Sequence, residues 1–335
     1  MDNGQYPVTP MNPPVTPKPL KLPFGEQQPP TELVRHLAPY YQTEHGAAYL
    51  GDSLEVMKTI PDASVNLVFT SPPYALHFKK EYGNVQKSEY VKWFLGFAEQ
   101  IRRILADDGS FVLNIGGSWN QGSPTRSIYQ YKLLTALVEE LGFYLAQECY
   151  WYNPAKMPVP AEWVTVRRIR VKDAVEHVWW FSKTPWPKAD NRRVLRPYSK
   201  DMLRLNQRGV KTTVRPSGHN INSSFDDISA GGSIPPNVFE DDIPTELLRM
   251  GNNASNDLYT KRCKEAGMKI HPARFPSAMP EFFIKMLTDE GDIVVDPFAG
   301  SNTTGAVAEI LSRRWIAVDT VEEHLSGSKF RFDLD

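Results

Sequence analysis

The chain has 335 residues, of which 41% are hydrophobic and 23% charged, and this composition supplies a buried core and excludes a largely disordered protein. Its 38 basic and 39 acidic side chains give a formal net charge of −1, which by itself does not indicate a nucleic-acid partner. Two distant cysteines exclude a disulfide framework or a cysteine-rich zinc site, and we expect no metal. The chain has no run of about 18 apolar residues, so we expect no membrane span. It also lacks a secretory start, which predicts a cytoplasmic protein.

The first segment differs from the rest of the chain in its proline content. Ten of the 28 prolines lie within the first 39 residues. Proline fixes its own φ angle and lacks a backbone N–H, so this density does not favour a helix or a sheet. We therefore expect residues 1–43 to form an extended, largely disordered leader.

From residue 47 onward, short apolar runs alternate with amphipathic segments. The apolar runs are the predicted strands, 47–50, 64–69, 110–115, 145–152, 177–181, 292–295 and 315–318. The amphipathic segments are the predicted helices, 54–59, 89–105, 127–141 and 303–311. Alternation of this kind is typical of an α/β fold with a mostly parallel sheet, here of seven strands.

One long stretch interrupts the alternation. Residues 186–270 are polar and rich in Gly, Asn, Ser and Pro, and no helix–strand pattern is visible in them. We expect a loop-rich insert that divides the sheet-forming sequence into residues 44–185 and residues 271–335.

A glycine-bearing string, Asp296–Gly305, follows one of the late strands and opens a helix. Such a turn lets backbone N–H groups approach a ligand at the positive end of a helix. An ordinary strand–helix turn is the alternative, but a ten-residue string is more specific than one glycine, so we predict a cofactor site. Asp319 ends the next strand, where an acid typically holds ribose hydroxyls; helix capping is its alternative role. The candidate cofactor residues in these two places are Asp296, Pro297, Phe298, Gly300, Ser301, Asn302, Thr303 and Asp319.

A second string, Thr70-Ser71-Pro72-Pro73-Tyr74, also lies at the carboxyl end of a strand. Its two prolines stiffen the turn and remove two donors, which leaves carbonyl acceptors beside the Ser71 hydroxyl and the flat Tyr74 ring. This combination predicts a socket for a planar group that bears an NH₂. A rigid proline turn without chemistry is the alternative.

The two strings together resemble the amino-group DNA methyltransferases that use S-adenosylmethionine (AdoMet). The Ser-Pro-Pro-Tyr string comes first and the glycine string last, an order that resembles the circularly permuted β-group of this family. A serine at position 71 resembles the form of this string in the cytosine-N4 branch. The resemblance covers residues 47–332 and is strongest to the PvuII-type modification methylases of restriction–modification systems. Other strings that resemble these enzymes are Gly51–Leu54, Arg215–His219, Gly232–Asn237 and His271–Pro276.

The resemblance implies a circularly permuted, Rossmann-like methyltransferase sheet of the α/β class with a target-recognition insert. Residues 44–185 would then be the catalytic part, 186–270 the insert and 271–335 the AdoMet-binding part. Asp52 would contact the adenosine of the cofactor, while Phe298, Gly300 and Asp319 would surround its methionine and ribose parts. Many relatives carry Glu in place of Asp319, which keeps the acceptor chemistry with a longer reach.

The resemblance also implies a reaction, which is methyl transfer to the N4 amino group of a cytosine flipped out of duplex DNA. The catalytic residues would be Ser71, Pro72, Pro73 and Tyr74, with the Ser71 hydroxyl and the Pro72 carbonyl as acceptors and the Tyr74 ring stacked on the base. Some relatives carry Asp in place of Asn114, so we expect the proton to leave to water. An adenine-N6 methyltransferase and a non-catalytic DNA-binding regulator are the alternatives. The lack of a Pro-Cys motif argues against methylation of cytosine C5.

DNA contacts are predicted from a basic block. Residues 188–215 carry nine basic and two acidic side chains, a net charge of +7 that is typical of phosphate contacts. A solvated helix face is the alternative. The candidate DNA-binding residues are Lys79, Lys80, Arg192, Arg193, Arg196, Arg215 and His219. We expect a monomer whose only other partner is functional, a cognate restriction endonuclease that cuts the unmodified site.

Overall fold

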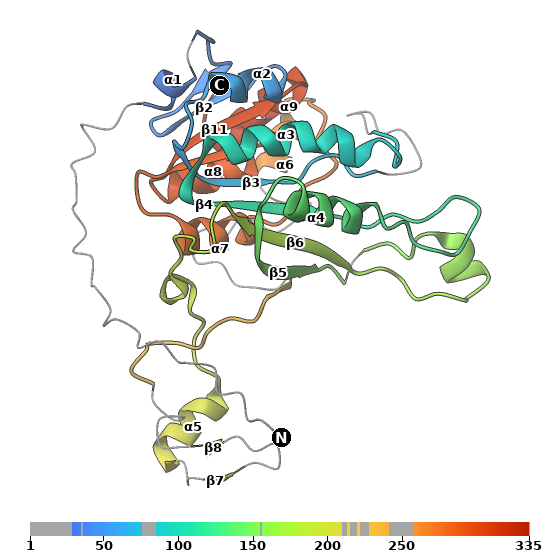
Figure 1. Ribbon diagram of the computed structural model, residues 1–335, viewed down its shortest axis with the longest axis vertical. Coiled ribbons are helices and arrows are strands. Elements are labelled where there is room, and N and C mark those ends of the chain that lie inside the picture. Colours follow the sequence, from blue (N-terminus) through green and yellow to red (C-terminus); the bar gives the residue numbers. More distant parts are fainter. Residues whose placement is uncertain are drawn as a thin grey trace, which may run out of the picture.

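In a computed structural model of the chain, the described residues are 29–34, 36–75, 85–154, 156–209, 213–214, 220–221, 228–240 and 258–334. They form a nine-stranded mixed sheet flanked by helices, together with a separate two-stranded ribbon (Figure 1). Along the large sheet the strand order is β1-β2-β11-β10-β3-β4-β6-β5-β9. None of the helices in these ranges is long and apolar enough to cross a membrane.

The strands of the large sheet are β1 Tyr41–Gln42, β2 Gly46–Leu50, β3 Val65–Thr70, β4 Leu105–Ile115, β5 Tyr144–Tyr152, β6 Val175–Ser182, β9 Val238–Glu240, β10 Ile293–Asp296 and β11 Arg314–Asp319. The ribbon consists of β7 Thr213–Val214 and β8 Asn220–Ile221. The α-helices are α1 Pro30–Leu33, α2 Ser53–Thr59, α3 Tyr90–Ile104, α4 Tyr129–Glu139, α5 Lys200–Arg208, α6 Leu258–Glu265, α7 Ala278–Leu287, α8 Thr303–Ile310 and α9 Glu322–Ser328. Shorter helical turns cover Glu162–Val166, Asn191–Val194 and Lys329–Arg331.

The centre of the sheet is parallel, which places the carboxyl ends of β2, β11, β10, β3 and β4 at one edge. β6 and β5 continue the sheet as an antiparallel hairpin next to β4. All seven predicted strands are therefore confirmed, and the α/β class with them. The two additional strands, β1 and β9, lie at the sheet edges and are too short to produce a periodic pattern in the sequence.

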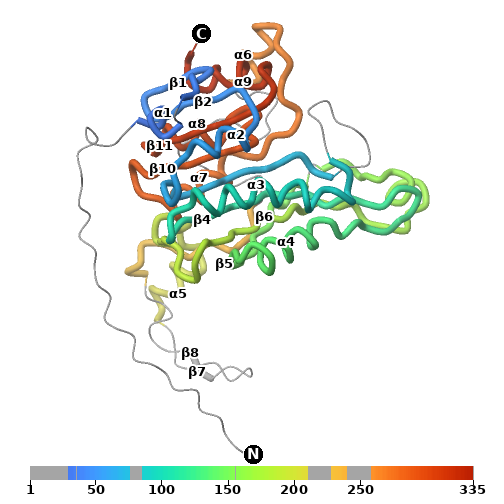
Figure 2. Tube along the Cα trace, turned by 45° about the horizontal axis from the view of Figure 1, so that its top comes forward, coloured from blue at the N-terminus to red at the C-terminus, as the bar shows by residue number. Residues whose placement is uncertain are grey.

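The core has two layers because alternate strand residues point to opposite faces of the sheet. Val68, Phe111 and Val295 pack in one buried cluster with residues of α2, α3 and α4, and these three helices lie along the same face (Figure 2). Leu67 and Val112 pack in the other cluster with residues of α7 and α8. The predicted apolar stripe of 89–105 is confirmed as the buried side of α3.

The structure corrects two expectations from the sequence. The described residues between 30 and 43 do not form an extended leader, because Leu33 of α1 and the following Val34 are buried, and Tyr41 pairs with Ala48 of β2. Pro30 is compatible with this helix because it stands in the first turn, where the N–H is not needed. The insert also contains regular structure, since α5, α6 and β9 fall between residues 186 and 270. Residues 1–28 lie outside the described ranges.

Candidate active site

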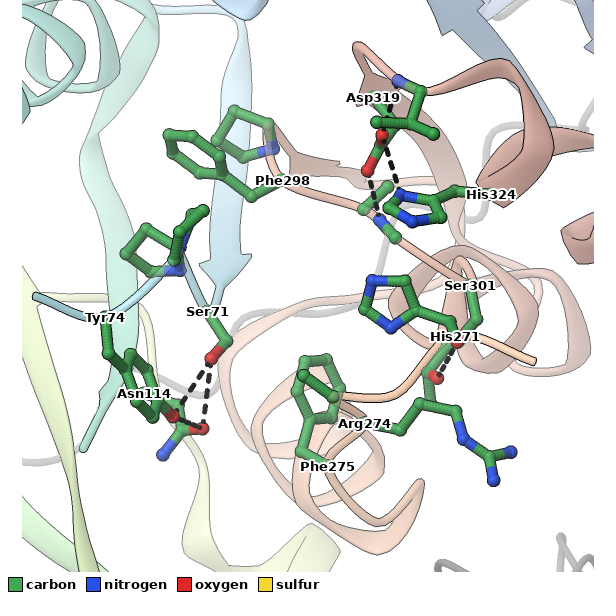
Figure 3. Close-up of a pocket in the computed structure, with 18 of the residues that line it drawn as sticks. Ser71, Tyr74, Asn114, His271, Arg274, Phe275, Phe298, Ser301, Asp319 and His324 are labelled. Carbon is green, nitrogen blue, oxygen red and sulfur yellow. Dashed lines mark hydrogen bonds and ion pairs between the residues drawn. The ribbon is translucent and has the colours of Figure 1, made fainter. Parts of the chain in front are cut away.

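A cavity of about 770 Å³ opens at the carboxyl edge of the parallel strands. Its lining includes most of the predicted site residues, namely Asp52, Ser71, Pro72, Pro73, Tyr74, Pro297, Phe298, Gly300, Ser301, Thr303 and Asp319. Figure 3 shows Ser71, Tyr74 and Asn114 on one side of the cavity and Asp319, His271 and His324 on the other. The two sequence motifs therefore meet at one site.

Asp296 joins the two motifs beneath the cavity. Its carboxylate accepts hydrogen bonds from Thr70 Oγ1 at 2.6 Å, from Thr304 Oγ1 at 2.7 Å and from the Phe298 N–H at 3.1 Å. The side chain is buried, and burial raises the pKa of Asp296 to about 6 against the hydrogen bonds, which lower it. Asp296 does not line the cavity, so its place in the site is to hold the turns after β10 and β3 together.

Asn302 also turns away from the cavity, although it was a candidate cofactor residue. Its backbone is left-handed, with φ 52°, and its side chain caps α8 by accepting from the Gly305 N–H at 3.0 Å. The amide group of Asn302 also donates to the Tyr41 hydroxyl at 2.9 Å. Asn302 therefore fixes the start of α8 and is not among the cavity residues.

The Asp319 carboxylate organises the cofactor side of the cavity. One oxygen accepts from the Gly300 N–H at 2.8 Å, and the other accepts from the Val321 N–H at 2.8 Å and faces His324 Nδ1 at 3.1 Å. Gly300 has φ 53°, a conformation that favours glycine, and an added Cβ would lie 3.0 Å from the His271 ring. These contacts fix the glycine turn against the end of β11.

Two histidines complete this wall. The rings of His271 and His324 meet edge to face, with their centroids 4.4 Å apart. Burial, followed by the neighbouring His324, lowers the pKa of His271 to about 4, so His271 is neutral at physiological pH. His271 belongs to the string His271–Pro276, which was identified in the sequence by its resemblance to the methyltransferases, whereas His324 stands alone in the sequence and was missed.

On the opposite side, the Ser-Pro-Pro-Tyr turn is fixed by a polar network. Ser71 Oγ donates to Asn114 Oδ1 at 3.2 Å and lies 3.3 Å from the Tyr74 hydroxyl. The Tyr74 hydroxyl in turn donates to Glu176 Oε2 at 2.7 Å. Burial and the Glu176 carboxylate raise the pKa of Tyr74 well above its ordinary value, so this hydroxyl keeps its proton. Glu176 was missed in the sequence because it is a single acid at the start of an aromatic strand.

Close packing sets the position of the Tyr74 ring. An added Cβ on Gly116 would lie 2.4 Å from Tyr74 Cε2, so only glycine fits at the position that follows β4. The Tyr90 hydroxyl donates to the Pro73 carbonyl at 2.9 Å and ties the turn to α3. Above the turn, Phe298 packs on Phe97 of α3, with ring centroids 4.9 Å apart, and provides an apolar wall.

Of the predicted DNA-binding residues, the three that the structure describes, Arg192, Arg193 and Arg196, do not line this cavity. Arg193 pairs with Asp289 at 2.7 Å and donates to the Thr288 carbonyl, both at the amino end of the strands and hence at the opposite edge. Arg192 pairs with Asp190 beside it, and the Arg196 backbone bridges to Ser233. The other candidates, Lys79, Lys80, Arg215 and His219, lie outside the described residues.

No group of three or more His, Cys, Asp or Glu side chains in the described part of the chain could hold a metal ion.

The sequence matches the family model of the DNA methylases over residues 65–330. It is 52% identical to the type II methyltransferase M.PvuII of Proteus hauseri over 297 residues, which cover 88% of this chain and 85% of that protein. It is 27% identical to the type II methyltransferase M.BglII of Bacillus subtilis over 312 residues, covering 92% and 75% of the two chains.

Solved structures show the same relationship. The PvuII DNA methyltransferase, described as cytosine-N4-specific, superposes with a TM-score of 0.70 at 46% identity, and the match covers 90% of each chain. A Thermus thermophilus protein named as a candidate DNA modification methylase, solved with S-adenosyl-L-methionine, superposes with a TM-score of 0.51 at 20% identity over 85% and 92% of the two chains. This second match supports the fold alone.

Proposed function

The chain belongs to the DNA methylase family, and from that premise we propose that it transfers a methyl group from AdoMet to the N4 amino group of cytosine in duplex DNA. One observation carries the proposal: the Ser-Pro-Pro-Tyr turn and the glycine turn line the same cavity. The identity to a cytosine-N4-specific enzyme favours cytosine over adenine.

The cavity residues fit AdoMet. Asp52, Asp319 and Phe298 line the cavity, and we assign Asp52 to the adenosine, Asp319 to the ribose hydroxyls and Phe298 to an apolar wall beside them. The His271 ring against Gly300 closes this side of the cavity without a charge, which suits a cofactor that is itself a cation. AdoMet would supply an electrophilic methyl group on a sulfonium, together with a neutral thioether as the leaving group.

The protein's contribution is to make the cytosine amino group nucleophilic. The Ser71 proton is directed to Asn114 Oδ1, and the Tyr74 proton is directed to Glu176, so the Ser71 oxygen presents a lone pair to an amino N–H. The Pro73 carbonyl is engaged by Tyr90, and we assign the second acceptor to the Pro72 carbonyl. Two acceptors draw the nitrogen toward tetrahedral geometry and bind the developing positive charge better than they bind the neutral amine.

The proposal is tested by incubating the protein with AdoMet and plasmid DNA and digesting the DNA to nucleosides. We expect N4-methylcytosine, and we expect Ser71→Ala to lose transfer while it retains AdoMet binding. N6-methyladenine alone would overturn the proposal in favour of the adenine enzyme. DNA binding without any methylated nucleoside would favour the non-catalytic regulator.

The biological setting follows from the resemblance and from the type II names of the relatives. We propose a cytoplasmic monomer that protects host DNA against a cognate restriction endonuclease. Within it, residues 44–185 and 271–335 would form the catalytic and AdoMet-binding parts, and residues 186–270 would contribute target recognition. Sedimentation of the free protein and of its DNA complex tests whether the protein is a monomer in each.

A further inference from the structure

The segment that joins β5 to β6, residues 153–174, leaves the protein at the rim of the cavity. We call this segment the arm. Trp151 and Asn153 at its start and Glu176 just past its end all line the cavity. The arm, in green, projects beyond the carboxyl edge of the sheet (Figure 1). A substrate that reaches the cavity from this side must therefore pass the arm.

The arm exposes an unusual number of aliphatic side chains. Val171 is 86% exposed, Met157 70%, Val166 68% and Ile169 59%. A single exposed aliphatic residue is ordinary on a protein surface, but four in one short segment indicate an interaction surface.

Positive charge accompanies the apolar side chains. The arm carries five basic residues and two acidic ones, a net charge of +3. Arg168 and Lys172 are exposed on either side of Ile169 and Val171. A surface of cations with aliphatic side chains between them matches a duplex, which presents phosphates outside and stacked apolar bases within its grooves.

The base of the arm is held in place by ion pairs. Asp173 pairs with Arg126 at 2.6 Å and with Arg170 at 3.5 Å, and Arg170 also donates to the Pro124 carbonyl at 3.0 Å. These contacts tie the arm to the neighbouring loop of residues 116–128. The exposed side chains are therefore presented on a supported projection.

We infer that the arm docks on the duplex beside the flipped cytosine, with Ile169 and Val171 entering a groove against the bases and Arg168 and Lys172 contacting phosphates. This inference rests on the proposed function, because it takes DNA as the substrate. It assigns DNA contacts to a segment at the cavity rim in place of Arg192 and Arg193, which lie at the opposite edge of the sheet.

The test compares two double variants by fluorescence anisotropy with labelled duplex DNA over a range of salt concentrations. Arg168→Gln with Lys172→Gln removes two phosphate contacts, so the slope of log affinity against log salt should become shallower by about two units. Ile169→Ser with Val171→Ser should weaken binding about tenfold and leave that slope unchanged. Lys58→Gln on α2 and Ile310→Ser on α8 are the matched controls, since both side chains are exposed away from the cavity.

Unchanged DNA affinity and slope in both double variants would overturn the inference, as would a loss of binding to anionic lipid vesicles in the same variants with DNA affinity intact. Calorimetric AdoMet binding reports whether each variant is folded. Failure of this inference can be distinguished from failure of the proposed function. The inference is measured by DNA affinity, whereas the proposed function fails if the wild-type protein transfers no methyl group to cytosine.

A second observation, the network behind Ser71, carries an independent inference. Glu176 is buried, yet its carboxylate reaches both the Tyr74 hydroxyl at 2.7 Å and Lys156 Nζ at 2.8 Å. Ser71 Oγ, Tyr74 OH and Glu176 Oε2 thus form a continuous row of hydrogen-bonding oxygens that begins at the methyl-transfer site. Asn114, which also contacts Ser71, is an amide and is not a base at neutral pH.

We propose that Glu176 receives the proton released by methyl transfer. In this step the Ser71 hydroxyl turns from Asn114 Oδ1 toward the Tyr74 oxygen, which lies 3.3 Å away. The methylated nitrogen then passes its proton to Ser71 Oγ, as Ser71 passes its own to the Tyr74 oxygen and Tyr74 passes its own to Glu176. The products are neutral N4-methylcytosine and a protonated Glu176, which then loses the proton to solvent. Glu176 acts through Tyr74 and Ser71 and is in this sense a positioning and relay residue.

Single-turnover methylation tests the relay. Glu176→Gln should slow transfer about a hundredfold, with KM for DNA and AdoMet affinity unchanged. Glu176→Asp should restore part of the rate. The double variant that combines Tyr74→Phe with Glu176→Gln should transfer methyl groups no more slowly than Tyr74→Phe alone. Glu148→Gln on the adjacent strand β5, outside the cavity, is the control. A wild-type rate of transfer in Glu176→Gln would refute the relay.

Discussion

Replacement of Asp296 by Asn should change how the stability of the protein depends on pH. The carboxyl is buried, and its pKa is raised in the folded protein from 3.8 to about 6. The folded state therefore binds the proton more tightly than the unfolded state does. Stability from this group is fully present below pH 3.8 and is lost as the pH rises through about 6.

The magnitude follows from the shift. At about 1.4 kcal/mol per pKa unit, the shift corresponds to a loss of about 3 kcal/mol of unfolding free energy for the wild type across this window. The asparagine side chain of the variant does not ionise, so the difference in unfolding free energy between Asp296→Asn and the wild type should move by about 3 kcal/mol in favour of the variant.

Urea unfolding at a series of pH values from about 4 to about 7.5, followed by tryptophan fluorescence, measures this difference. Asp201→Asn serves as the control, because that side chain is 91% exposed. A difference that does not change with pH, or one that moves in favour of the wild type as pH rises, would refute the assignment of Asp296 as a buried, desolvated acid.

Three further substitutions test other parts of the site. Gly116→Ala places a methyl group 2.4 Å from the Tyr74 ring and should slow methyl transfer at least a hundredfold with AdoMet affinity preserved, as single-turnover assays and calorimetry will show. Gly300→Ala combines a φ of 53° with a 3.0 Å contact to His271, and calorimetry should show AdoMet affinity reduced about tenfold. Arg192→Gln should leave DNA affinity and its salt dependence unchanged, since this side chain lies at the edge of the sheet opposite the cavity; a shallower salt slope would restore the sequence-based prediction.

Much of the fold could be predicted because its strands are buried on both faces and appear as apolar runs. The central strand β10 and the glycine turn after it are examples, since both are local features of consecutive residues. The helix α1 could not be predicted in the same way. Pro30 and Leu33 of this four-residue helix are buried and the helix contacts β2 and the distant strand β11, a tertiary environment that the proline-rich sequence does not reveal.

In the site, too, the position of a single side chain could not be predicted where it depends on contacts with distant residues. The motif around Asp296 was identified, but whether a given side chain faces the ligand or the core depends on partners such as Thr70, far away in the sequence. Glu176 and His324 were missed because neither belongs to a local pattern. The net charge of a segment also does not show which way its side chains point. Arg193 lies in a basic block, yet it is paired with Asp289.

The central claim is that this chain methylates N4 of cytosine, and the most direct test is to sequence DNA from cells that express it. Modification-sensitive sequencing should find N4-methylcytosine at one recurring short sequence, on both strands, and none in cells that express Ser71→Ala. N6-methyladenine at a recurring site, or no modification beyond that of the Ser71→Ala cells, would contradict the claim.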